Sequence, residues 1–301
     1  MRPIKRAAAL SLGALLALSV TACGGGTAET DDPQARIQAA MEKLNAAESM
    51  EATITMEMDM TAMGQTMESD TIMEMVCFTD PMKLKADMTM DMGDLGSITM
   101  TMYAQEEDGQ YTSYLYDGSS WISSVMDLGD LEQYDAQQSM DLYIQSGADY
   151  AHQGTEEING VTADKYTGVI RGDALEEVLA ASGAGDSMSA TLGETDLSQL
   201  YSDLGGLPIT VWVDSESGYP VRCFMDMTAL MDGMMDAALA IAAEEASDET
   251  NLDVGVAKMA FTIDCSAYNS AADFDIPEEA LAGGGWRRRP ANAGRAGRAR
   301  A

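Results

Sequence analysis

Histidine is almost absent from this sequence: His152 is the single one, in a polar Ala-His-Gln-Gly stretch. Without a second histidine or a Gly-x-Ser-x-Gly segment, the sequence has little with which to build a nucleophilic or general-base site. It also lacks a glycine-rich phosphate loop, a Cys-x-x-Cys pair and a calcium-loop spacing. We therefore expect no enzyme activity, no cofactor and no metal site, with His152 exposed in a loop.

Basic residues are scarce as well. The chain has 17 Lys and Arg against 50 Asp and Glu, a net charge of −33. Only eight of the basic residues lie between Cys23 and Trp286, where all of the acidic ones lie. Binding of nucleic acid needs a basic surface, so this composition argues against a nucleic-acid partner.

No apolar run reaches the roughly 20 residues that a membrane-spanning helix needs. The apolar run from Ala7 to Val20 follows three positive charges in residues 1–6, which is the layout of a secretory signal peptide. It ends in Val20-Thr21-Ala22-Cys23, which resembles the lipobox of bacterial lipoproteins. That resemblance implies that residues 1–22 are removed and that Cys23 is acylated, through diacylglyceryl and often palmitate. An ordinary cleaved signal or an uncleaved anchor are the alternatives.

The rest of the chain divides by composition. Residues 23–32 contain Gly24-Gly25-Gly26 and polar side chains, which predicts a flexible tether. Residues 33–282 have the apolar content of a single folded domain. Residues 283–301 carry six arginines among Gly, Ala and Pro without periodicity, which predicts a disordered tail. The tail either contacts anionic partners or the acidic body, or has no role.

Strict alternation is the strongest structural signal. From Met50 to Thr61 apolar and polar residues alternate, which only a strand with one dry and one wet face explains. Similar patterns predict further strands at 67–78, 82–92, 98–102, 110–116, 120–126, 161–170, 209–213, 219–229 and 254–265. Helical spacing predicts helices that begin at Asp32-Pro33, at Asp173 and at Thr195, and another over 231–242. The fold class is therefore α+β, a one-sided antiparallel sheet with helices on its dry face.

Two short motifs resemble a known superfamily. Val211-Trp212-Val213-Asp214 and Gly218-Tyr219-Pro220-Val221-Arg222 form a hairpin pattern similar to that of LolA-like and LppX/LprG-like lipoproteins, and the Ile276–Ala280 ending fits too. The resemblance implies a curved, incomplete antiparallel barrel whose concave apolar face is covered by helices. Some members carry lipids or lipidated proteins and others sense envelope stress, so it implies a fold rather than one function.

Methionine is abundant, with 25 residues concentrated on the dry strand faces. Because its side chain is flexible and polarizable, a methionine surface adapts to varied apolar partners. One interpretation is a ligand cavity lined by Met56, Met58, Met60, Met73, Met75, Met88, Met90, Met100, Met102, Met225 and Met227. The other interpretation is a packed core without a ligand, and Cu(I) binding by thioethers is a third.

Three cysteines remain after Cys23, each on the apolar side of a strand: Cys77, Cys223 and Cys265. An odd number cannot pair fully within one molecule. A disulfide between Cys223 and Cys265 is one arrangement, and buried reduced thiols are the favoured one.

These observations together predict a monomeric lipoprotein on the outer face of the cytoplasmic membrane, anchored through Cys23. Its function is to bind or carry a lipid, acyl chain or lipidated peptide. The alternative is a structural or envelope-stress protein that uses the same fold as an interaction surface.

Overall fold

The computed structural model describes residues 32–107, 110–126, 136–181, 206–245 and 254–282. The predicted signal peptide, tether, helix at Thr195 and arginine-rich tail lie outside these residues. The described strands are β1 (Ser49–Ala62), β2 (Gln65–Thr79), β3 (Met82–Asp91), β4 (Ser97–Glu107), β5 (Gln110–Tyr116), β6 (Trp121–Met126), β7 (Gly147–Ile158), β8 (Val161–Ile170), β9 (Leu207–Asp214), β10 (Pro220–Asp226) and β11 (Val254–Ser266). The helices are α1 (Pro33–Asn45), α3 (Ala136–Ser146), α4 (Asp173–Ala181), α7 (Thr228–Glu245) and α8 (Glu278–Ala282), with a 3-10 turn, η1 (Gly93–Leu95).

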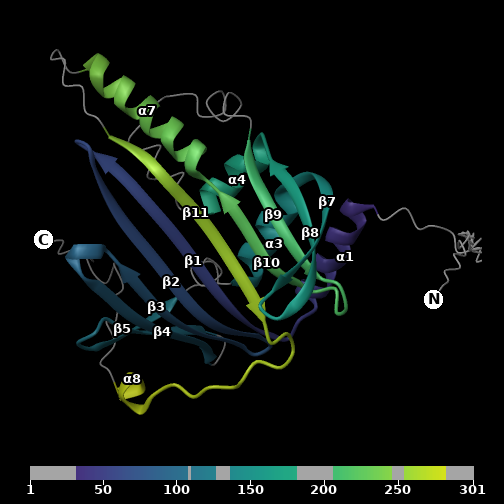
Figure 1. Cartoon of the computed structure of the whole chain (residues 1–301). Coiled ribbons are helices and arrows are strands. Elements are labelled where there is room, and N and C mark those ends of the chain that lie inside the picture. The colour runs from purple at the N-terminus through teal and green to yellow at the C-terminus, as the bar shows by residue number, and fades with distance from the viewer. Residues whose placement is uncertain (1–31, 108–109, 127–135, 182–205, 246–253, 283–301) are drawn as a thin grey trace, which may run out of the picture. The chain divides into compact units, whose positions relative to one another are not determined.

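The described strands all belong to one antiparallel sheet. Its order is β6-β5-β4-β3-β2-β1-β11-β10-β9-β8-β7, so β1 and β11, the first and last of the described strands, are neighbours in its middle. Within the described residues, the edge strands β6 and β7 do not pair with each other, and the sheet stays open. Figure 1 shows the long strands curving, with α3 and α4 on one side of β10 and β11. The predicted α+β, curved and incomplete barrel is confirmed.

The two faces of the sheet differ as the alternation predicts. We call the face that carries Met50, Ala52 and Ile54 the inner face, and the opposite one, with Glu51 and Thr53, the outer face. Four helices contribute buried residues to the same core as the inner face, among them Leu44 of α1, Met140 of α3, Leu175 of α4 and Met234 of α7. The core therefore lies between the inner face and these helices.

Local chemistry explains where the helices begin and end. The Asp32 carboxylate accepts a hydrogen bond from the Gln34 backbone N–H at 3.1 Å, and Pro33 follows it, so α1 begins where the sequence predicts. The last carbonyls of a helix lack helical donors. Gln137 Nε2 donates to the Leu44 carbonyl at the end of α1, over 2.7 Å. Tyr150 donates to the Ile144 carbonyl at the end of α3, over 2.8 Å.

Some predictions were wrong in detail. Strand β7 and helix α3 were not predicted, and His152 lies in β7 rather than in a loop. The predicted strand over 219–229 ends at Asp226, and α7 begins at Thr228. There the Thr228 backbone N–H donates to the Asp226 carboxylate at 3.0 Å, a local cap that turns the chain from strand into helix.

The segment after β11, residues 267–282, forms what we call the C-terminal strap. Its Phe274, Ile276 and Ala280 pack with Tyr103 and Tyr114 on the outer face of β4 and β5. Lys83 donates to Asp273 at 2.6 Å and also to the Phe274 carbonyl. An apolar part of the outer face is thereby covered by the chain's own end.

Candidate functional site

The strand register brings the predicted cavity methionines together on the inner face. One line of neighbours across six strands runs Cys223, Ile263, Ile54, Met73, Met88, Met100. The next runs Met225, Phe261, Met56, Thr71, Met90, Ile98. Cross-strand neighbours on one face have Cβ atoms about 4.5–5.5 Å apart, so these thioethers lie side by side.

The eleven predicted methionines fall into two groups by burial. Met75 and Met225 are 2% and 1% exposed and belong to the core, as does Met227. Met102 at the edge of the core is partly buried and packs against it, as Met73 also does. The others are partly exposed, and we call them the methionine face: Met56, Met58, Met60, Met73, Met88, Met90 and Met100. Beside them Ile98 is 46% exposed and Met67 55%.

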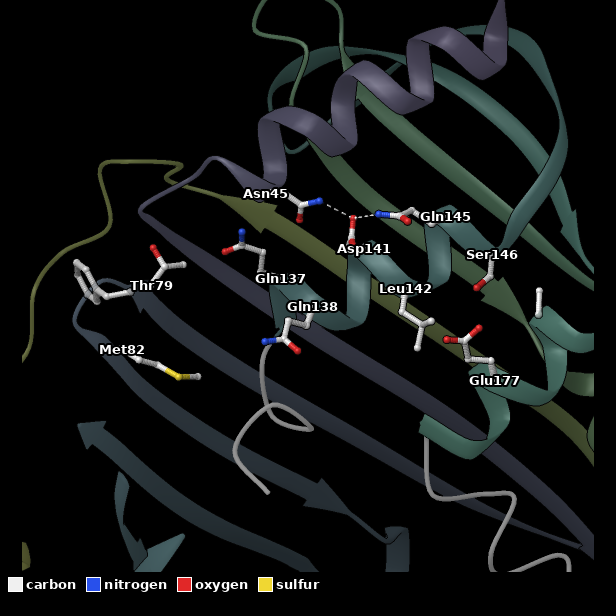
Figure 2. Close-up of a pocket in the computed structure, with 12 residues that line it drawn as sticks. Asn45, Thr79, Met82, Gln137, Gln138, Asp141, Leu142, Gln145, Ser146 and Glu177 are labelled. Carbon is white, nitrogen blue, oxygen red and sulfur yellow. Dashed lines mark hydrogen bonds between the residues drawn. The ribbon is translucent and has the colours of Figure 1, made fainter. Parts of the chain in front are cut away.

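A separate pocket of about 760 Å³ lies at the other end of the sheet, among the end of α1, helices α3 and α4, and the β2–β3 turn. Figure 2 shows its lining. None of the eleven predicted methionines lines it, and Met82 does. The lining is largely polar, with four side-chain amides and the carboxylates of Asp141 and Glu177, over apolar contacts from Met82 and Leu142.

Asp141 organises the polar side of this pocket. Asn45 Nδ2 and Gln145 Nε2 both donate to its Oδ1 atom, at 2.9 and 2.6 Å, and these bonds are drawn in Figure 2. Asp141 and Gln145 stand four residues apart on α3, so they share one face of that helix. Sequence reasoning missed this site because it did not predict α3. The run of Gln137, Gln138, Asp141 and Gln145 was its only signal.

Among the described residues, Cys77, Cys223 and Cys265 are buried and form no disulfide. Cys223 pairs in register with Ile263, two residues from Cys265, so the two cysteines are diagonal neighbours. Diagonal Cα atoms are about 7–8 Å apart, outside disulfide geometry, which explains why the possible Cys223–Cys265 disulfide is not formed. Burial raises the pKa of Cys265 to about 12 and also raises that of Cys223. Cys265 Sγ instead contacts Met140 Sδ at 3.3 Å.

His152 and Ser215 both bind Asp164 rather than each other. His152 Nε2 lies 3.2 Å from Asp164 Oδ1, and Ser215 Oγ donates to Oδ2 at 3.1 Å. Arg36 lies 3.6 Å from the same carboxylate. In a catalytic triad the serine hydroxyl donates to the histidine, which acts as its base. Here the Ser215 hydroxyl donates to Asp164 instead, so these residues form a cluster of polar and ionic contacts around Asp164.

Two searches of the described residues bear on other kinds of site. None of their helices combines the length and apolar character needed to cross a membrane. Among the same residues, no group of three or more His, Cys, Asp or Glu side chains is arranged so that it could hold a metal ion.

Comparisons with known proteins give the following likenesses. Residues 34–154 match the model of a family of unknown function, DUF6612. No curated protein matches the chain. Among solved structures it is similar to the lipoprotein LppX of Mycobacterium tuberculosis, with 14% identity over 82% of this chain and 100% of the other, at a TM-score of 0.42.

Two further solved structures are similar. LprF of Mycobacterium bovis is 12% identical over 82% of this chain and 98% of the other, at a TM-score of 0.43. A LolA-superfamily protein of Nitrosomonas europaea is 9% identical over 82% and 95%, at a TM-score of 0.18.

Proposed function

We propose that this protein is a lipid-anchored, extracytoplasmic binding protein, not an enzyme, that holds an apolar ligand against the methionine face. The anchor is Cys23, and the ligand is a lipid, an acyl chain or a lipidated peptide. The observation that carries the proposal is the methionine face itself, a set of adjacent, partly exposed thioethers on four neighbouring strands and the adjoining Ile98.

The chemistry of this face favours a long, flexible ligand. Thioether side chains adapt to irregular apolar shapes, and neighbouring strands present them without an intervening charge on the inner face. Burying one methylene contributes about 0.8 kcal/mol. Micromolar binding corresponds to a net free energy of about 8 kcal/mol, and the contacts must supply at least this much because they also offset the cost of association. About ten methylenes or more must therefore contact the protein, which is the length of a fatty acyl chain.

The location is proposed on separate grounds. The N-terminal charge pattern and Val20–Cys23 support export and acylation at Cys23. A Cys23→Ser variant is expected to leave the membrane fraction and appear in the soluble extracytoplasmic fraction. If the variant and the natural protein fractionate alike, the anchor is not at Cys23.

The packed part of the inner face favours the second candidate, an interaction protein without a ligand. Met75, Met140 and Met225 are at most 2% exposed, so this part of the space between sheet and helices is filled by side chains. Under that interpretation the methionine face contacts a protein partner in the envelope.

The test uses the chain lacking residues 1–23 and the neutral fluorescent probe N-phenyl-1-naphthylamine, which the acidic protein does not repel. The double variant Met88→Gln with Met100→Gln changes two register neighbours in the methionine face. The control is Ile72→Gln, which is 45% exposed on the outer face of the adjacent strand. We expect the double variant to bind the probe about tenfold more weakly, a loss of about 1.4 kcal/mol.

Lipid extraction and native mass spectrometry of the same protein complete the test. A bound long-chain lipid supports the carrier function. A purified protein that contains no lipid and binds neither the probe nor palmitate contradicts the proposal. The interaction protein without a ligand is then the better interpretation. Equal losses in the double variant and the Ile72→Gln control also contradict it.

A further inference from the structure

The pocket beside α3 presents more unused hydrogen-bond acceptors than donors. The amide nitrogens of Asn45 and Gln145 are both turned toward Asp141 Oδ1, as Figure 2 shows. This orientation is fixed by charge, because an amide oxygen facing a carboxylate would be repelled. Each amide therefore has its oxygen left for another partner.

Two further donors of the lining are also used within the protein. Gln137 Nε2 donates to the Leu44 carbonyl at 2.7 Å, and Thr79 Oγ1 donates to the Glu48 carbonyl at 3.3 Å. In contrast, Asp141 Oδ2 and the Glu177 carboxylate have no hydrogen-bond donor among the described residues. Nor does any lysine or arginine occur in the described lining.

We propose that this pocket binds an organic cation, a primary ammonium on a short apolar stem. An ammonium offers three donors and no acceptor, which matches a lining whose unused atoms are mostly acceptors. Bonds from a charged donor to carboxylates are the strong kind of hydrogen bond. The stem rests on Met82, Leu142 and Ala174, all of which pack against the main core.

Other ligand classes fit the lining less well. An anion meets two carboxylates and no described cation, so it is repelled. A neutral polyhydroxylated ligand brings no positive charge to Asp141 and Glu177, so its hydrogen bonds to these carboxylates are weaker than those of an ammonium. The inference does not rest on the proposed function, because no residue of the methionine face lines this pocket.

The experiment titrates the chain lacking residues 1–23 with three probes of equal length: hexylammonium, hexanol and hexanoate. Isothermal calorimetry measures affinity, and the side-chain NH₂ signals of Asn45 and Gln145 report the place of binding by NMR. We expect hexylammonium alone to bind and to shift those two signals. Asp141→Asn should weaken its binding by about tenfold, the loss of one charge-assisted hydrogen bond.

A matched control distinguishes specific binding in this pocket from general attraction of a cation to an acidic protein. Asp94→Asn removes the same charge at an exposed turn, in η1, away from the pocket. We expect this variant to bind like the natural protein. Equal losses in Asp94→Asn and Asp141→Asn, or hexylammonium-induced shifts spread over the acidic strands, would overturn the proposal. Equal binding of hexanol or hexanoate would also overturn it.

Discussion

Replacing Tyr150 by phenylalanine tests how the end of α3, and with it the pocket, is held. Tyr150 is 7% exposed, and its hydroxyl donates to the Ile144 carbonyl at 2.8 Å. That carbonyl lies in the last turn of α3, where helical donors are missing. Removing the hydroxyl leaves a buried acceptor without this donor, which costs about 1–3 kcal/mol. We expect Tyr150→Phe to be less stable by that amount at pH 7.

The same variant carries a pH signature. Burial raises the pKa of Tyr150 well above its ordinary value of 10.0. Above about pH 10 the tyrosine of the unfolded chain therefore loses its proton, while the buried tyrosine of the folded protein keeps it. The stabilising contribution is complete below about pH 10, and it declines by about 1.4 kcal/mol per pH unit as the pH rises further. The phenylalanine of the variant has no proton to lose, so the difference in stability between the two proteins should shrink and vanish between about pH 11 and 12.

Urea unfolding followed by tryptophan fluorescence, at a series of pH values from neutral to about pH 11, measures this difference. Tyr143, whose pKa burial raises to about 12, titrates in both proteins and cancels. The control is Tyr116→Phe, which removes the hydroxyl of a partly exposed tyrosine. A stability difference that stays constant across this series, or that is absent at neutral pH, would refute the reasoning.

Three further predictions follow from packing. Gly168→Ala places a Cβ 2.8 Å from Cε1 of Tyr150, so we expect a loss of about 1–3 kcal/mol, read as a lower melting temperature. Phe274→Ala removes the ring by which the C-terminal strap packs against Phe78 and Tyr103, so limited proteolysis within the strap should become faster at equal global stability. Cys223 and Cys265 are 0% and 4% exposed with raised pKa values, so neither should react with Ellman's reagent until urea unfolds the chain.

The sheet was predictable where one face is dry and the other wet. Met50 to Thr61 alternates without a break, and the structure pairs that strand on both sides over most of its length. Since side-chain direction has a period of two, the alternation alone assigned the predicted methionines of β1 to β4 to a common face. It could not show which of them are buried, because burial depends on where the helices pack.

The sequence pattern did not predict β7 and α3, the elements near the pocket, for physical reasons. Strand β7 is an edge strand with irregular pairing after Ala148 and after His152, which breaks the period of two. Helix α3 buries Gln137 alongside its apolar residues, so its helical period is masked by a polar side chain at a core position. Edge position and buried hydrogen bonds are properties of the assembled fold.

By itself, the sequence determined the dry and wet sides of the strands, the start of α1 at Asp32-Pro33 and the acidic character of the chain. Those features depend on neighbours along the chain and on side-chain chemistry. Only the tertiary structure decided that β1 pairs with β11, that Cys223 and Cys265 stand diagonally, and that Asn45 and Gln145 meet at Asp141. The reason is that each of these contacts joins residues whose separation in space is set by how the sheet and helices pack, which no local pattern encodes.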